Sequence, residues 1–280
     1  MYQRFLFLLV SICLLFFTGP AGAAPIWVER KFIPEVSLID ETFLQHKDGA
    51  AYAVDHTPWA EFLSTYLVEG EDGINRVSYG DVTPDALAAL EKYLGDLQGE
   101  QVESLDQAEQ LAFWINLYNA ETVRTIIHHY PVKSIRAIDG VWGEKRLNVS
   151  GIPLSLGDIE HRIIRVKFPD PRIHYALNCA AEGCPNLAKE PYIRDTLADA
   201  LDAAAVTFLN HSRGVRINND KVIVSKIFGW YIEDFGGTEE AALEHIIKYA
   251  RPDLSTMLRA INDIDAYRYD WSLNDASRDD

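Results

Sequence analysis

Apolar residues recur at helical spacing in two segments of the first half of the chain. Leucines follow one another every three or four residues between Pro84 and Leu97, so this segment has one apolar face. Thr83 precedes it as a capping residue, and proline is tolerated in the first helical turn. A second apolar face runs from about residue 106 to residue 129, ahead of Pro131. The spacing therefore predicts helices over residues 84–97 and 106–129.

The second half of the chain mixes helical and extended patterns. Ser155 and Asp158 have the spacing of a capping box at the start of a helix. Helices are predicted over residues 155–166, 191–209 and 238–250, and strands over residues 173–177 and 222–227, the latter after a hairpin turn at 218–220. Because helices and strands do not alternate regularly, we expect an α+β fold, a single domain with helices packed around a small, mainly antiparallel sheet.

The N-terminus has the pattern of a secretory signal peptide. Arg4 is the only charge before the apolar run Phe5–Phe17, and Ala21 and Ala23 form an A-x-A cleavage signal. The run is shorter than the roughly 20 residues needed to span a bilayer. We therefore expect a periplasmic or secreted protein with no stable membrane insertion after cleavage. The predicted organisation is a signal peptide over 1–23, an extension over 24–54, the main domain over 55–274 and a polar tail over 275–280.

The charge of the chain limits its partners. It has 42 acidic and 26 basic residues, giving a net charge of −16, or −17 without residues 1–23, whose only charge is Arg4. Nucleic acids and anionic lipids are bound through basic surfaces, so we expect neither as a partner. Phosphate-binding and dinucleotide-binding glycine motifs are absent from the sequence, and we expect no cofactor.

Two cysteines, Cys179 and Cys184, follow the predicted signal peptide. Cys184 stands between Gly183 and Pro185, in a turn after a predicted strand, where catalytic groups are often presented. A thiol there becomes a nucleophile when a base or a positive charge stabilises its thiolate. The alternatives are a disulfide with Cys179 and an inert buried thiol.

Polar residues on predicted elements supply further candidates. In an extended segment 173–179, His174 and Cys179 lie on opposite faces, with Cys179 toward the core. A wheel of 100° per residue places Glu160 on the apolar face of its helix and His161 on the polar face. Glu160 then needs a partner, either in a structural ion pair or as an orienter in an active site. His174 is a candidate base, although a lone strand histidine is more often structural.

The long helix and a later patch add candidate binding residues. Asn116 and Asn119 lie one turn apart, and their amides either cap neighbouring backbone or act as oxyanion donor and histidine orienter. Lys226 and Trp230 belong to a mixed polar and aromatic patch, in which Trp230 is either a substrate platform or part of the core.

Several motifs in order carry a family resemblance. They are AFWINLYNA at 112–120, LSLGDIEH at 154–161, DPRIHYALNC at 170–179 with Cys184-Pro185, SKIFGWYIEDF at 225–235 and YDWSLN at 269–274. With them the chain resembles the domain of unknown function family 547, as a secreted bacterial-type member, over about residues 55–274. The resemblance makes His161 a candidate base and implies a fold similar to papain-like or transglutaminase-like enzymes.

Together these residues favour a thiol-dependent hydrolase or acyltransferase. Cys184 attacks an amide or ester carbonyl, His161 or His174 exchanges its proton, and Glu160 or Asn116 orients the base. The expected substrate is a peptide or a cell-envelope amide. The alternative is a non-catalytic binding or scaffold domain with a Cys179–Cys184 disulfide. We expect no metal, because the set His174, Cys179 and Cys184 matches no common ligand spacing.

Overall fold

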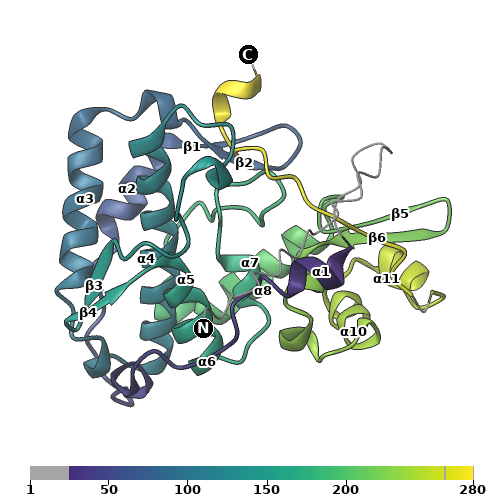
Figure 1. Ribbon diagram of the computed structural model, residues 1–280, viewed down its shortest axis with the longest axis horizontal. Helices are drawn as coiled ribbons and strands as arrows, with labels where there is room; N and C mark the ends of the chain where they lie inside the picture. Colours follow the sequence, from purple (N-terminus) through teal and green to yellow (C-terminus); the bar gives the residue numbers. More distant parts are fainter. Residues whose placement is uncertain (1–24, 262, 280) are drawn as a thin grey trace, which may run out of the picture.

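The computed structural model describes residues 25–261 and 263–279 (Figure 1). The predicted signal peptide, residues 1–23, lies outside the described residues. Within the described part of the chain, no helix is long and apolar enough to cross a membrane. Two hydrophobic cores organise the molecule, a larger one in the helical half and a smaller one around the last sheet.

The helical half is built around α4, Gln107–His129. Asp106 caps it by accepting the N–H of Ala108, and the helix is buried on nearly all sides because other elements surround it. The amphipathic α3, Pro84–Gln98, begins at the predicted cap Thr83 and packs between α4 and α2, Thr57–Tyr66. The two helices predicted in this region are confirmed.

The strands form small sheets at the edges of the helical layers. Two are antiparallel hairpins, β1–β2 (Leu67–Glu69, Asn75–Val77) and β3–β4 (Leu147–Val149, Ile152–Leu154). In the third sheet, β5 (Val215–Asn218) pairs antiparallel with β6 (Lys221–Ser225), and β7 (Ala266–Arg268) pairs parallel with β6. Asn219 and Asp220 have φ of 49° and 62°, the left-handed conformation that a tight hairpin requires, so the predicted turn is confirmed.

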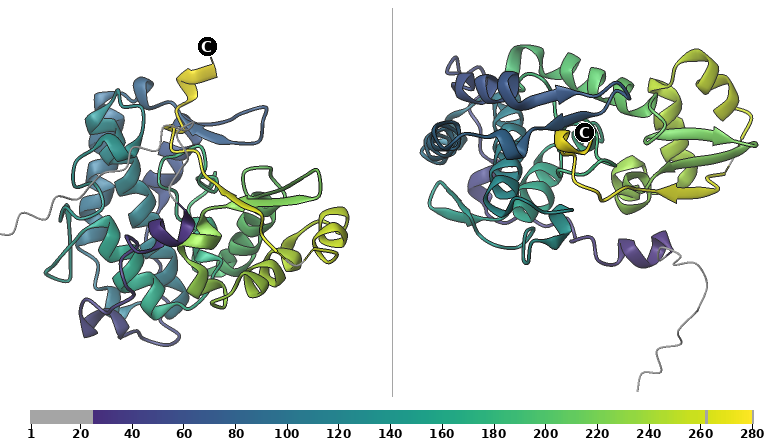
Figure 2. Two further views of the ribbon diagram at one scale, coloured as in Figure 1. Left: turned by 45° about the vertical axis from the view of Figure 1, so that its right-hand side comes forward. Right: turned by 90° about the horizontal axis from the view of Figure 1, so that it is seen from above.

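The smaller half packs α8 (Leu197–Leu209), α10 (Glu239–Tyr249) and α11 (Pro252–Leu258) against the third sheet. In Figure 2, α1 (Ile26–Arg30) lies beside this half, against α9 (Ile227–Trp230). Short 3-10 helices complete the chain at Glu41–Leu44, Tyr79–Asp81, Val102–Ser104, Ile135–Ala137, Arg194–Thr196, Ile232–Phe235 and Ala276–Asp279. The α+β single-domain prediction is confirmed, whereas a papain-like or transglutaminase-like arrangement is not.

Three local predictions are wrong. Residues Ile173–Ala176 form a helical turn, α7, because the N–H groups of Ile173 and His174 bond to the carbonyls of Asp170 and Pro171. The strand parity that separated His174 from Cys179 therefore does not exist. Ile227 begins helix α9 instead of continuing the strand, and the α-helix predicted from residue 191 begins at Leu197.

Candidate functional site

The predicted helix after Ser155 changes its winding where the candidate residues lie. Ser155 and Asp158 make the predicted capping box over α5, Leu156–Asp158. The next segment, Ile159–Ile164, is a π-helix, and α6, Arg165–Lys167, follows it. A π-helix bonds each residue to the fifth one along, so it turns less per residue than an α-helix. Single π-helical turns occur frequently at functional sites.

The π-helix buries two neighbouring polar residues together. Glu160 and His161 are each 7% exposed. The 100° wheel, which placed His161 on the polar face, is therefore wrong, because it assumed α-helical winding. It also left Arg165 on that face, whereas Arg165 is buried.

Glu160 is an ionised carboxylate inside the protein. The Tyr118 hydroxyl donates to its Oε2 at 3.1 Å, and the Tyr231 hydroxyl also bonds to it. Burial raises the pKa of Glu160, but nearby positive charge and the hydrogen bond from Tyr231 outweigh burial and hold it below its usual value. The site thus keeps a negative charge where water has little access.

The neighbouring His161 is held in its neutral form. Burial lowers its pKa, against the opposing effect of Glu160, whose Oε1 lies 3.9 Å from His161 Nδ1. Arg165 Nη1 donates to the same Nδ1 at 3.3 Å, which assigns the remaining proton to Nε2.

Asp234 joins two basic side chains at the edge of this cluster. It accepts from Arg165 Nε at 2.6 Å and Nη2 at 2.9 Å, and from His174 Nε2 at 2.7 Å. Burial opposes ionisation, but the bonds from His174 and Arg165 hold the pKa of Asp234 well below its usual range. The Tyr231 ring contacts both of these side chains. Its centroid lies 4.1 Å from that of the stacked His174 ring and 5.0 Å from the Arg165 guanidinium carbon.

The two cysteines form a disulfide beside this cluster. Cys184 is 3% exposed, while Cys179 is partly exposed, so the prediction that Cys179 points into the core is wrong. The Tyr269 hydroxyl donates to both sulfurs at 3.0 Å, and the Cys179 N–H donates to Cys184 Sγ at 3.0 Å. Two hydrogen-bond donors therefore converge on the Cys184 sulfur.

Tyr269 links the sulfurs to Glu160 electrostatically. Burial raises the pKa of the Tyr269 hydroxyl, the Glu160 charge raises it further, and Arg213 lowers it. The Tyr269 ring packs against Trp230 at 4.8 Å and Trp271 at 4.7 Å. Tyr269 therefore contacts the disulfide with its hydroxyl and an aromatic cluster with its ring.

The predicted binding residues Lys226 and Trp230 meet at the carboxylate of Glu29. Lys226 Nζ pairs with Glu29 Oε1, and Trp230 Nε1 donates to Glu29 Oε2 at 2.9 Å. Trp230 is 9% exposed and also belongs to the smaller core. Trp230 therefore has the core role, and its indole nitrogen also donates to Glu29.

Asn116 and Asn119 use their amides on the backbone. Asn116 donates to the Tyr192 carbonyl at 2.7 Å and accepts the Tyr192 N–H at 3.0 Å. Asn119 donates to the Ala176 carbonyl at 2.9 Å and accepts the Asn178 N–H at 2.8 Å. These bonds correspond to the capping role, and those of Asn119 position the segment that leads to Cys179.

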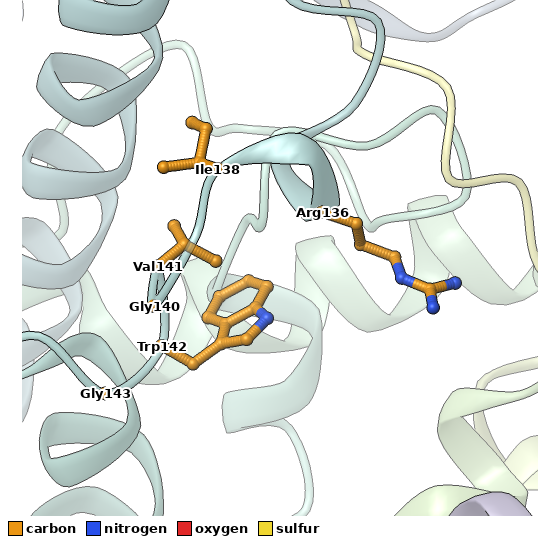
Figure 3. Close-up of a pocket in the computed structure, with 6 residues that line it drawn as sticks. All are labelled: Arg136, Ile138, Gly140, Val141, Trp142 and Gly143. Atoms are coloured by element: carbon orange, nitrogen blue, oxygen red, sulfur yellow. The ribbon is translucent and has the colours of Figure 1, made fainter.

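A shallow pocket of about 300 Å³ lies in the loop before β3 (Figure 3). Its lining includes Arg136 and Trp142, both labelled in this view. The Trp142 carbonyl accepts the N–H of Gly157 at 2.9 Å, which ties the loop to the helix of Glu160. The Arg136 guanidinium lies 5.2 Å from the Trp271 ring. The pocket loop is thus in contact with the start of α5 and with Trp271.

Sequence reasoning missed the three tyrosines of the site, Tyr118, Tyr231 and Tyr269. Tyr118 is one residue from Asn119 and Tyr231 follows Trp230, so their motifs were recognised while their hydroxyls were not assigned a role. Tyr269 reaches the sulfurs from the last strand region, and no local spacing relates it to them. The metal set considered earlier does not assemble, since His174 bonds to Asp234 and the cysteines bond to each other.

Comparison with known proteins gives a family and no activity. No curated protein matches the chain, and no solved structure does. Residues 102–209 match the model of a family described as "Protein of unknown function, DUF547". This range holds α4, the π-helix and both cysteines, and the match confirms the family recognised from the motifs. Residues 102–209 therefore carry the chain's similarity to the DUF547 family.

Proposed function

We propose that this protein is a thiol-dependent hydrolase or acyltransferase whose nucleophile is Cys184, and that the Cys179–Cys184 disulfide is its latent form. The observation that carries the proposal is the convergence of the Tyr269 hydroxyl and the Cys179 N–H on the Cys184 sulfur. After reduction by an external dithiol, the same two donors would stabilise a thiolate on Cys184.

The surrounding groups suit acyl transfer. The Cys184 thiolate attacks the carbonyl carbon of an amide or ester, and the C–N or C–O bond breaks as the leaving atom takes up a proton. Water then hydrolyses the thioester, or another nucleophile accepts the acyl group. We assign Glu160, whose charge acts on the Tyr269 hydroxyl, as the group that accepts the thiol proton and returns it to the leaving group. His161 and His174 act as positioning residues, held by Arg165 and by Asp234 respectively.

The substrate we propose is a peptide or a cell-envelope amide outside the cytoplasm. The signal-peptide pattern of residues 1–23 supports export. An oxidising compartment also accounts for a disulfide in the resting protein. The pocket at Arg136 and Trp142 supplies one cation and one large apolar ring for substrate contacts.

The second candidate is a non-catalytic binding domain. It is favoured by the disulfide itself, which braces residues 179–184 whether or not a thiol reaction follows. The two candidates differ in what happens when Cys179 alone is removed, because a bracing disulfide needs both sulfurs and a nucleophile needs one.

The test compares Cys179→Ser with Cys184→Ser, two variants that lose the same disulfide. Each is treated with a peptide chloroacetamide probe and with an activated ester, without reductant. We expect Cys179→Ser to be labelled at Cys184 and to turn over the ester, and Cys184→Ser to do neither. Wild type should become reactive only after treatment with dithiothreitol. Equal labelling of the two variants, or labelling of neither, would leave the binding domain as the better account.

A further inference from the structure

Helix α1 carries a carboxylate that another part of the chain binds as it would bind a ligand. Glu29 projects from Ile26–Arg30 onto α9, where one carboxylate oxygen pairs with Lys226 and the other accepts from the Trp230 indole. A cation and a neutral donor on the two oxygens of one carboxylate form a specific arrangement, because each lone-pair direction has its own partner.

The two sides of this contact differ in burial. Lys226 is 8% and Trp230 is 9% exposed, so the receiving side is built into the protein. No residue of α1 is buried, and Trp27 at 56% and Phe32 at 82% are exposed beside it. None of its residues is fully buried, so the Glu29 contacts and the partly buried Ile26 hold this segment in place.

If α1 moved away from α9, the Lys226 ammonium group would lose its counter-charge. Within residues 25–261 and 263–279, its ion pair is with Glu29 alone. A largely buried ammonium group without a counter-charge is costly, and the adjacent indole N–H also requires an acceptor. One carboxylate from a bound peptide would supply both the counter-charge for Lys226 and the acceptor for the indole N–H.

An apolar slot lies next to the carboxylate position. A Cβ on Gly229 would stand 2.2 Å from Ile26 Cγ1, so only glycine lets this side chain approach the α9 backbone. The Tyr267 ring borders the same space. Ile26 and Glu29 are three residues apart, on one face of a helical turn. The slot and the cation therefore recognise a branched aliphatic residue followed three positions later by a glutamate.

We propose that Lys226, Trp230 and Gly229 form a binding site for glutamate-containing peptides, and that the N-terminal segment 25–36 is its resident, displaceable ligand. The site lies beside the disulfide, because the Trp230 ring packs 4.8 Å from the Tyr269 ring whose hydroxyl contacts both sulfurs. A peptide held there would place its neighbouring residues near Cys184. The binding itself does not require the thiol chemistry proposed above.

The experiment uses the full chain with its disulfide intact. Glu29→Lys sets a like charge against Lys226 and displaces the segment, while Glu35→Lys changes an exposed residue of the same segment and serves as the control. A fluorescent peptide of residues 25–36 is titrated by anisotropy. We expect at least tenfold tighter binding to Glu29→Lys than to wild type or to Glu35→Lys, because the internal competitor has been removed.

The peptide and the receiving side are then varied separately. On the Glu29→Lys protein, a peptide with Glu29→Gln should bind at least tenfold more weakly, and a peptide with Glu35→Gln should bind with unchanged affinity. A protein that combines Glu29→Lys with Lys226→Met should not bind the peptide. Urea midpoints of all variants establish that they are folded. Equal affinity of wild type and Glu29→Lys, or of the Glu29→Gln and unmodified peptides, would overturn the inference. Because no thiol is exposed in these assays, their outcome is separate from that of the labelling test.

Discussion

The Nε2 atom of His174 lies 2.7 Å from the Oδ2 atom of Asp234, and the same oxygen accepts Arg165 Nε at 2.6 Å. One carboxylate thus joins α7, α6 and the 3-10 helix Ile232–Phe235. Ile232 and Phe235, which flank Asp234 in this 3-10 helix, belong to the smaller core. The ion cluster therefore fixes the relative position of the groups around Glu160.

Replacing Asp234 with alanine should strongly destabilise the protein. Arg165 is buried and would lose its bidentate partner, and breaking a buried pair in this way costs about 3 kcal/mol. The free energy of unfolding in urea measures the effect. Asp96→Ala, which removes the exposed pair with Lys92, should change stability little. Similar losses in both variants would show that Asp234 does not hold the cluster together.

Replacing Glu160 with glutamine tests the proposed proton acceptor. Glutamine preserves the shape and an acceptor for Tyr118 but removes the charge. In a Cys179→Ser background, we expect Glu160→Gln to slow ester turnover by roughly a hundredfold, the range of general acid–base catalysis. Glu109→Gln is the matched control, since Glu109 is a buried carboxylate that bonds to the Val54 N–H elsewhere in the fold. Equal turnover in the two variants would remove Glu160 from the mechanism.

The sequence was sufficient for the elements that local patterns determine. Thr83 caps the helix it was predicted to cap, the long helix begins next to Asp106 as predicted, and Asn219 and Asp220 form the predicted turn. In each case the side chain or backbone that sets the local structure lies within a few residues of it in the sequence. The capping box of Ser155 was predictable for the same reason.

The candidate site was predictable only in part, because its geometry depends on distant contacts. Both Glu160 and His161 were singled out, but the π-helix that buries them together has no signal in a 3.6-residue periodicity. The turn at Ile173–Ala176 was predicted as a strand because its residues alternate, whereas its backbone N–H groups bond to the carbonyls of Asp170 and Pro171 and set a helical conformation. Tyr269 reaches Cys184 across 85 positions of sequence, which no local pattern reports.

Stability should fall between pH 6.5 and pH 4 because of His56. Burial lowers the pKa of His56 from 6.5 to about 4. Between these values the unfolded chain binds a proton that the folded chain does not, so the free energy of unfolding decreases as the pH falls, by about 3 kcal/mol in total. In His56→Phe, the free energy of unfolding should depend less steeply on pH in this range, by the equivalent of one bound proton. Urea unfolding at steps of half a pH unit measures this slope.

A control separates burial of His56 from its hydrogen bond. Tyr93→Phe removes the hydroxyl that lies 2.7 Å from His56 Nδ1 but leaves the ring buried. It should lower stability at every pH and keep the slope of the wild type, because burial is the larger cause of the shift. Identical slopes in wild type and His56→Phe would contradict the prediction.

Asn119 should control the segment that carries the cysteines, although it touches neither sulfur. Its buried amide bonds to the Ala176 carbonyl and the Asn178 N–H, so Asn119→Leu leaves two backbone groups unpaired and should cost about 3 kcal/mol. Looser backbone at Asn178 should also speed reduction of the disulfide by dithiothreitol, measured from thiol release below the urea transition. Asn148→Leu, at an exposed position, should alter neither quantity. If Asn119→Leu lowers stability but leaves the reduction rate unchanged, the amide supports the fold without positioning the sulfur site.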